Sequence, residues 1–109
     1  MAILDRFRLD GQKAVVTGGG KGIGRGIALA LAEAGADVLV AARSGSDVES
    51  VAADIRRLGR VGAAMAIDVT GADAMERLAA EAVAQLGGLT IWVNNAGGIP
   101  SATPLTLRK

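Results

Sequence analysis

Glycines dominate the stretch in which residue types and spacing most clearly suggest chemistry. Residues 17–24 read TGGGKGIG and follow directly after the apolar run 13–17. Glycine adopts positive φ without strain, and its missing side chain lets a ligand approach the backbone closely. If a helix begins within this stretch, its unpaired N–H groups and the positive end of its dipole favour an anion such as a phosphate. The alternative is that the glycines form only a flexible connection.

Composition and charge exclude several other kinds of chemistry. The 109 residues contain no cysteine and no histidine, so disulfides and the usual ligands of a transition metal are missing. The net charge is +1 and acidic residues separate the basic ones, which gives no electrostatic case for nucleic acid. No apolar segment has the length of a signal peptide core or a membrane span. We therefore expect one small, soluble, cytoplasmic domain without membrane or nucleic-acid partners.

A phosphate-binding turn needs a strand before it and a helix after it, and the chain offers both repeatedly. Continuous apolar runs predict buried strands at 13–17, 38–42, 63–67 and 89–93. Apolar residues at helical spacing lie between these runs, and the three helices are expected to end at Gly35, Gly59 and Gly87-Gly88. This alternation predicts an α/β protein with a partial Rossmann, or doubly wound, fold. Its parallel sheet has the strand order 3-2-1-4, with helices on both faces.

The pattern also predicts which helix residues are buried and where the helices begin. Ser46 with Glu49 has the spacing of a capping box for the second helix, and Thr70 and Asp73 offer a cap for the third. The expected apolar faces are Ile23, Ile27, Ala30, Leu31 and Ala34 in the first helix, Val48, Val51, Ala52, Ile55 and Leu58 in the second, and Met75, Leu78, Ala79, Ala82, Val83 and Leu86 in the third.

Three motifs follow the carboxyl ends of predicted strands: residues 17–24 after the first, Asp68-Val69 after the third, and 94–97, which read NNAG, after the fourth. With these motifs in this order, the chain resembles the short-chain dehydrogenase/reductase family, specifically its common single-domain subtype. The resemblance covers nearly the whole chain. It implies that residues 1–109 are the N-terminal, dinucleotide-binding portion of a single Rossmann domain.

The resemblance implies a role for each motif. The turn from Gly18 to Gly24 would wrap the cofactor pyrophosphate, with Ile23 on the nicotinamide side. Asp68 would accept a hydrogen bond from the adenine amino group, and the Val69 backbone would support the ring. Asn95, Ala96 and Gly97 would pass along the ribose, and Asn94 would tie neighbouring strands together. The alternatives are a plain turn carboxylate at Asp68 and a simple asparagine turn at 94–97.

Charge at the end of the second strand favours NADP over NAD. A carboxylate there usually holds the ribose hydroxyls of NAD, whereas NADP needs cations for its 2′-phosphate. The sequence reads Ala42-Arg43-Ser44 at this point, and Lys21 adds a positive charge within the glycine turn. Asp37 lies at the opposite end of the strand. Taken singly, Arg43 or Lys21 could be a solvated loop residue. The expected cofactor-binding residues are Gly18, Gly20, Lys21, Gly22, Ile23, Gly24, Arg43, Ser44, Asp68, Val69, Asn95, Ala96 and Gly97.

The residues with which the family performs catalysis are missing from this chain. The family uses a serine together with a tyrosine and lysine in a Tyr-x-x-x-Lys arrangement, and these 109 residues contain no tyrosine. We therefore expect no catalytic residue here, and a fourth strand whose open edge pairs with the remainder of the enzyme or with another copy. The expected function is the NADP(H)-binding portion of a reductase that interconverts alcohols and carbonyls by hydride transfer. The alternatives are a non-catalytic nucleotide-binding module or an inactive fragment.

Overall fold

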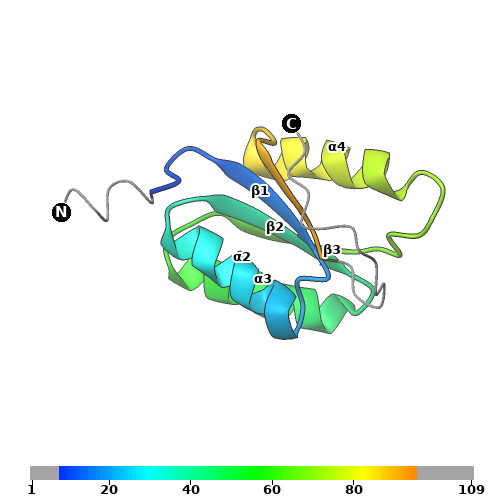
Figure 1. Cartoon of the computed structure of the whole chain (residues 1–109), viewed down its shortest axis with the longest axis horizontal. Coiled ribbons are helices and arrows are strands. Elements are labelled where there is room, and N and C mark those ends of the chain that lie inside the picture. The colour runs from blue at the N-terminus through cyan, green and yellow to red at the C-terminus, as the bar shows by residue number, and fades with distance from the viewer. Residues whose placement is uncertain (1–7, 96–109) are drawn as a thin grey trace.

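Four parallel strands form the centre of the fold (Figure 1). The structure is a computed structural model, and it describes residues 8–95. The strand order is β3-β2-β1-β4, as the sequence predicts. The strands are β1 (Lys13–Thr17), β2 (Asp37–Ala42), β3 (Gly62–Ala66) and β4 (Ile91–Asn94).

Three of the strands begin or end a little away from the predicted positions. β2 includes Asp37, because this residue pairs with Lys13 of β1. β3 ends at Ala66, although the apolar run continues to Ile67, which is buried and donates its backbone N–H to Ala42 O at 2.9 Å. β4 begins at Ile91, two residues later than predicted. Apolar runs mark burial rather than pairing, so burial extends beyond the hydrogen-bonded ladder at the end of β3, whereas the ladder extends beyond the apolar run at the start of β2.

Three helices within residues 8–95 cover the two faces of the sheet, as predicted. Helices α2 (Gly22–Glu33) and α3 (Gly45–Arg57) lie on one face, and α4 (Ala74–Leu86) lies on the other (Figure 1). The helices end where the glycines predict: Gly35, Gly59 and Gly87 all have positive φ. In the described part of the chain, no helix combines the length and apolar character that a bilayer crossing requires.

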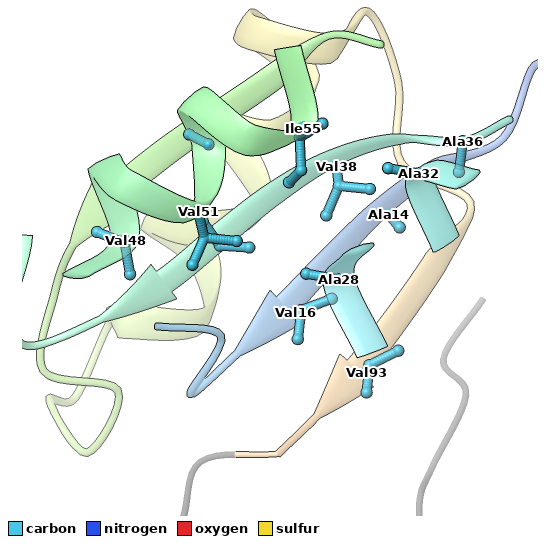
Figure 2. Close-up of a cluster of buried hydrophobic side chains, with 12 residues drawn as sticks. Ala14, Val16, Ala28, Ala32, Ala36, Val38, Val48, Val51, Ile55 and Val93 are labelled. Atoms are coloured by element: carbon cyan, nitrogen blue, oxygen red, sulfur yellow. The ribbon is translucent and has the colours of Figure 1, made fainter. Parts of the chain in front are cut away.

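Each face of the sheet has its own apolar core, because successive residues of a strand point to opposite faces. On β1, Val16 points towards α2 and α3, while Val15 points towards α4. Figure 2 shows the first of these clusters, in which Val16 and Val93 of neighbouring strands lie against α2. Trp92 belongs to the second cluster and is 8% exposed.

The predicted apolar face of α2 is confirmed only in part: Ile27 and Leu31 are half-buried and pack against the first cluster, and Ala34 is half-buried. The buried residues of α2 are Gly24, Ala28 and Ala32, whereas Ile23 is 77% exposed and Ala30 is exposed. The reason is close packing: a Cβ atom at Gly24 would lie 2.0 Å from the carbonyl oxygen of Gly18. Only the smallest residues fit at such a distance, so the small side chains of the helix face the sheet (Figure 2).

The predicted capping box of Ser46 and Glu49 is wrong, and of the two cap candidates for α4 only Asp73 occupies the N-cap position. Ser44, not Ser46, is the N-cap of α3, and its hydroxyl accepts a hydrogen bond from the Asp47 N–H at 3.4 Å. The N-cap of α4 is Asp73, and no side chain caps this helix. Thr70 bonds to Asp68 instead.

The buried faces of α3 and α4 are confirmed with a few exceptions. Most of the predicted residues are buried or half-buried. Leu58, Met75 and Val83 are exposed instead, at 44%, 39% and 53%. The apolar stripe in the sequence is therefore wider than the surface that each helix packs against the sheet.

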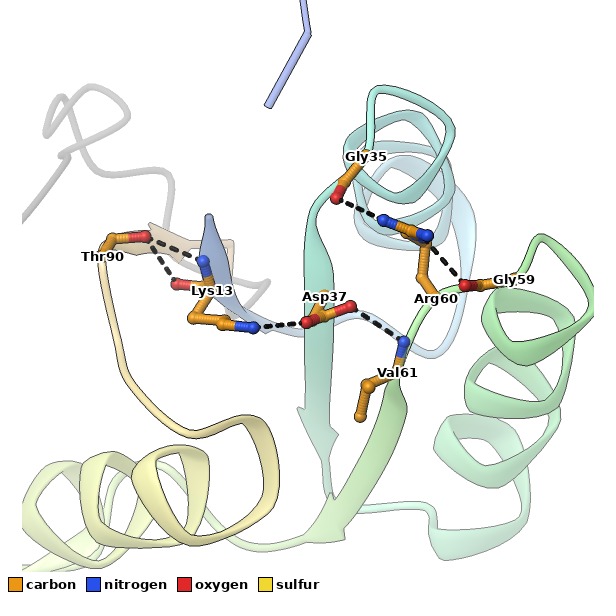
Figure 3. A network of polar contacts seen from close by, with 7 residues as sticks. All are labelled: Lys13, Gly35, Asp37, Gly59, Arg60, Val61 and Thr90. Carbon is orange, nitrogen blue, oxygen red and sulfur yellow. Dashed lines mark hydrogen bonds and ion pairs between the residues drawn. The ribbon is translucent and has the colours of Figure 1, made fainter. Parts of the chain in front are cut away.

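A chain of polar contacts links all four strands at the amino end of the sheet (Figure 3). The Thr90 hydroxyl accepts from the Lys13 N–H at 2.8 Å. Lys13 Nζ donates to Asp37 Oδ2 at 2.6 Å, and Asp37 Oδ1 accepts from the Val61 N–H at 2.9 Å. Burial opposes the ionised form of Asp37, but these hydrogen bonds outweigh it and lower the pKa of its carboxyl group.

The close contact between Gly24 and Gly18 leads to a prediction about stability. Gly24→Ala places a methyl group against a backbone carbonyl, and it should lower the free energy of unfolding by about 1–3 kcal/mol or more. Gly26→Ala is the matched control in the same helix, because a Cβ there would meet no other described residue within 4 Å beyond its chain neighbours and the backbone of its own helix. It should raise stability by about 0.5–1 kcal/mol, since alanine favours the helix. Urea denaturation measures both, and equal effects would contradict the close packing.

Candidate functional site

Four loops meet at the carboxyl end of the sheet, because the strands are parallel and β1 lies between β2 and β4. The glycine turn follows β1, Arg43 and Ser44 follow β2, Asp68 and Val69 follow β3, and Asn95 follows β4. The structure therefore places the predicted segments at one edge. The predicted site residues Ala96 and Gly97 lie outside the described residues.

The glycine turn bends sharply between β1 and α2. Gly18 and Gly22 have φ of 66° and 55°, in the left-handed region that other residues rarely adopt. The Gly18 N–H donates to Ala41 O at 2.7 Å, which anchors the start of the turn to β2. Among residues 8–95, a Cβ atom at Gly22 would have no atom within 4 Å apart from its chain neighbours and the backbone of its own helix, so this part of the turn leaves room for a ligand.

The beginning of α2 suits an anion. Its N-cap is Lys21, whose side chain cannot accept a hydrogen bond, and no side chain from the described part of the chain caps the helix. The first turn of the helix contains no acidic residue. The free N–H groups and the positive end of the helix dipole therefore face the turn, and the first turn of α2 itself supplies no carboxylate to pair with them. A phosphate group of a dinucleotide fits this arrangement.

Thr17 joins the glycine turn to the loop after β4. Its side chain is fully buried, and its hydroxyl accepts from the Asn95 N–H at 2.9 Å and lies 3.1 Å from Asn94 Oδ1. Asn94 thus does tie the two strands together. A Cβ atom at Gly24 would lie 2.6 Å from Asn95 Nδ2, so the Asn95 amide packs against the first turn of α2.

The two predicted cations have different surroundings. Lys21 is 81% exposed, and its Nζ lies 3.5 Å from Asp47 Oδ2 in the first turn of α3. Arg43 is exposed and forms no hydrogen bond or ion pair with the rest of residues 8–95. Its charge acts on Asp68, whose pKa it helps to lower. Both cations can reach an anion at this edge, but Lys21 already has a carboxylate beside it.

Asp68 is held as an ionised acceptor after β3. Its Oδ1 accepts from the Thr70 hydroxyl at 2.6 Å and from the Thr70 N–H at 3.0 Å. These hydrogen bonds, with a smaller effect of the Arg43 charge, lower the pKa of Asp68 below its ordinary value of 3.8. Because both hydrogen bonds go to Oδ1, the other oxygen can accept from a ligand.

Sequence reasoning missed two contributors to this edge. Thr70 stands two residues after Asp68, which is the spacing of a local turn closed by an aspartate side chain, so a signal for its role existed. Asp47 carries no such signal, because its proximity to Lys21 depends on how α3 packs over the glycine turn. A Cβ atom at Gly20 would lie 2.8 Å from the Asp47 Cβ.

The fold is of the Rossmann type, and the loops described above gather at the switch between β1 and β4, where ligands bind in open α/β sheets. The sequence profile of the short chain dehydrogenase family matches residues 12–108. The chain belongs to this family.

Individual relatives agree with this assignment. The chain is 49% identical over 104 residues to an uncharacterized oxidoreductase of Mycobacterium tuberculosis, covering 95% of this chain and 40% of that protein. The structure of a hydroxysteroid dehydrogenase from Escherichia coli is 41% identical with a TM-score of 0.82, covering 86% of this chain and 39% of the other. A 7α-hydroxysteroid dehydrogenase solved with NADH and 7-oxo glycochenodeoxycholic acid is 37% identical with a TM-score of 0.79, covering 92% and 40%. The chain spans about 40% of the length of these relatives.

The hydrogen bond from the Asn95 N–H to the Thr17 hydroxyl leads to a prediction about stability. Thr17→Val keeps the shape but leaves the Asn95 N–H without its acceptor, and it should lower the free energy of unfolding by about 1–3 kcal/mol. Thr90→Val is the matched control, because Thr90 bonds the same strand pair at the opposite end but is exposed, so water can replace its hydroxyl. Chemical denaturation should show the smaller loss for Thr90→Val. Equal losses of stability in the two variants would contradict the role assigned to the Thr17 hydroxyl.

The hydrogen bonds to Asp68 predict how it titrates. A carboxyl-carbon NMR titration should give Asp68 a pKa below 3.8. Thr70→Val should raise this pKa towards the ordinary value, whereas Thr70→Ser should leave it low because the hydroxyl remains. Since the pKa is lower in the folded state, the stability from these contacts is present above the unfolded pKa and lost as the pH falls through the folded pKa. An unchanged pKa in Thr70→Val would contradict the assignment.

Proposed function

We propose that this chain forms the NADP(H)-binding portion of a short-chain dehydrogenase/reductase that interconverts alcohols and carbonyls. The observation that carries the proposal is the uncapped start of α2, which meets a glycine turn and two cations at the carboxyl edge of the sheet. The cofactor would supply or accept the hydride. The chain's own residues would bind and orient it.

The glycine turn would hold the pyrophosphate through the free N–H groups at the start of α2. Gly18 and Gly22 give the turn its shape, Gly20 packs against α3, and Gly24 brings the helix close to β1. Ile23 is 77% exposed on this first turn, where it would contact the nicotinamide side of the cofactor. An exposed isoleucine beside an anion site gives an apolar ring a surface to pack on.

Asp68 and the loop after β4 would position the adenosine. The unpaired oxygen of Asp68 would accept from the adenine amino group, and the backbone of Val69 would support the ring. Asn95, whose backbone is fixed by Thr17, would lead the chain along the ribose, followed by Ala96 and Gly97.

A preference for NADP over NAD is part of the proposal. Arg43 and Ser44 stand where an NAD enzyme usually carries a carboxylate, and Arg43 is exposed and able to form a bidentate contact with a 2′-phosphate. Lys21 adds a second cation at the same edge. One relative was solved with NADH, so the preference of this chain between NADP and NAD has to be measured.

The groups that move the proton in such a reaction are proposed to lie in the remainder of the enzyme, since this chain spans about 40% of its relatives. A nucleotide-binding module without chemistry is the second candidate. The intact mass of the natural protein, compared with its encoding reading frame, distinguishes the two candidates.

The Arg43 side chain gives the direct test of this function. Fluorescence titration of the full chain should show tighter binding of NADPH than of NADH. Arg43→Ala should weaken NADPH binding by about tenfold, since a hydrogen bond to a charged group contributes about 1.5–3 kcal/mol, and should change NADH binding little.

Arg77→Ala is the matched control for this test, because it removes the same charge from an exposed position on α4. It should leave both affinities unchanged. If the wild-type chain bound neither dinucleotide, or if Arg43→Ala affected NADH as much as NADPH, the proposed function or its cofactor preference would be wrong.

A further inference from the structure

A carboxylate lies among the cations to which we assign the 2′-phosphate of NADP. Asp47 Oδ2 is 3.5 Å from Lys21 Nζ, and the Asp47 side chain is 32% exposed. Sequence reasoning gave this residue no role, and cofactor binding as proposed above does not use it. Its position nevertheless affects Lys21, because an ammonium group paired with a carboxylate is less available to a second anion.

The backbone of Asp47 is fixed against the glycine turn. A Cβ atom at Gly20 would lie 2.8 Å from the Asp47 Cβ and 3.6 Å from a Val48 methyl group, so the first turn of α3 packs directly on the turn. The Asp47 N–H donates to the N-cap hydroxyl of Ser44, which holds the start of α3. The packing of α3 therefore holds the backbone and Cβ of Asp47 beside the glycine turn.

The start of α3 itself favours a carboxylate at residue 47. The carboxylate lies in the first turn of α3, where the positive end of the helix dipole favours a negative charge. The same negative charge opposes a phosphate that approaches Lys21, and NAD carries no phosphate at this position.

We propose that Asp47 is a specificity-determining residue that competes with the 2′-phosphate of NADP for the Lys21 ammonium group. Its presence lowers the preference for NADP(H) that Arg43 and Lys21 create. This inference rests on the proposed function, because it concerns the same binding edge.

The test compares the affinities of the full chain for NADPH and NADH by fluorescence titration. Asp47→Asn keeps the side-chain shape and the N–H of residue 47, and it should tighten NADPH binding by about two- to fivefold, the range expected for an exposed ion pair. NADH binding should change by less than about twofold. Asp47→Ser serves as a second variant, and thermal unfolding establishes that each variant is folded.

Asp54→Asn is the matched control. Asp54 lies on the same helix and pairs with Arg25 and Arg57, so its substitution makes the same change in net charge away from Lys21. It should alter neither affinity by more than about twofold. A gain for NADPH as large as that of Asp47→Asn would show a general charge effect and overturn the proposal.

A double-mutant cycle with Lys21→Met tests the competition itself. If Asp47 acts by occupying Lys21, the gain from Asp47→Asn should disappear when Lys21 is already Met. An equal gain in that background would overturn the proposal, as would weaker NADPH binding by Asp47→Asn alone.

The outcomes separate this inference from the proposed function. If the wild-type chain binds neither dinucleotide, the proposed function fails and the role of Asp47 falls with it. If the wild-type chain prefers NADPH and Asp47→Asn leaves that preference unchanged, the proposed function stands and only the role of Asp47 is overturned.

Discussion

The close approach of α2 to the end of β1 is the constraint on which this structure depends. Gly24 lies so near the Gly18 carbonyl that no side chain fits between them. This contact brings the uncapped start of the helix over the glycine turn and against the Asn95 amide. It also explains why Ala28 and Ala32, rather than larger residues, face the sheet. The geometry that suits an anion is therefore a consequence of packing as much as of glycine flexibility.

The sequence predicted the order of strands and the faces of the sheet covered by each helix, because buried parallel strands and glycine-ended helices leave clear periodic signals. It predicted the buried face of α2 only in part, because Ile27 and Leu31 are half-buried but Ile23 is exposed. Periodicity assumes that large apolar residues are buried, whereas here the helix lies too close to the sheet for Ile23. The start of α3 was also misplaced, because Ser44 and Ser46 are equivalent as sequence and only the backbone path selects Ser44 as the cap.

For the candidate site, the sequence predicted the segments that the sheet brings together, since each motif follows a strand whose carboxyl end lies at the same edge. It could not predict contacts between elements. The pair formed by Lys21 and Asp47 depends on α3 resting on the glycine turn, and nothing in the spacing of the two residues indicates it. The hydrogen bonds from Thr70 to Asp68 are local and follow from short-range spacing. Contacts between residues that are close in the sequence could therefore be predicted, whereas contacts between different helices could not.

The bond between Thr17 and the loop after β4 has a consequence for the order of folding. Lys13 and Asp37, which join β1 to β2, are 24 residues apart in the chain, whereas Thr17 and Asn94 are 77 apart. Closing the longer loop costs more conformational entropy, so pairing that is close in sequence forms more readily than the pairing of β4. A partly folded chain can thus contain the glycine turn without Asn95 beside it. A ligand that needs both would bind only the complete sheet, and by mass action it would stabilise the last part to form.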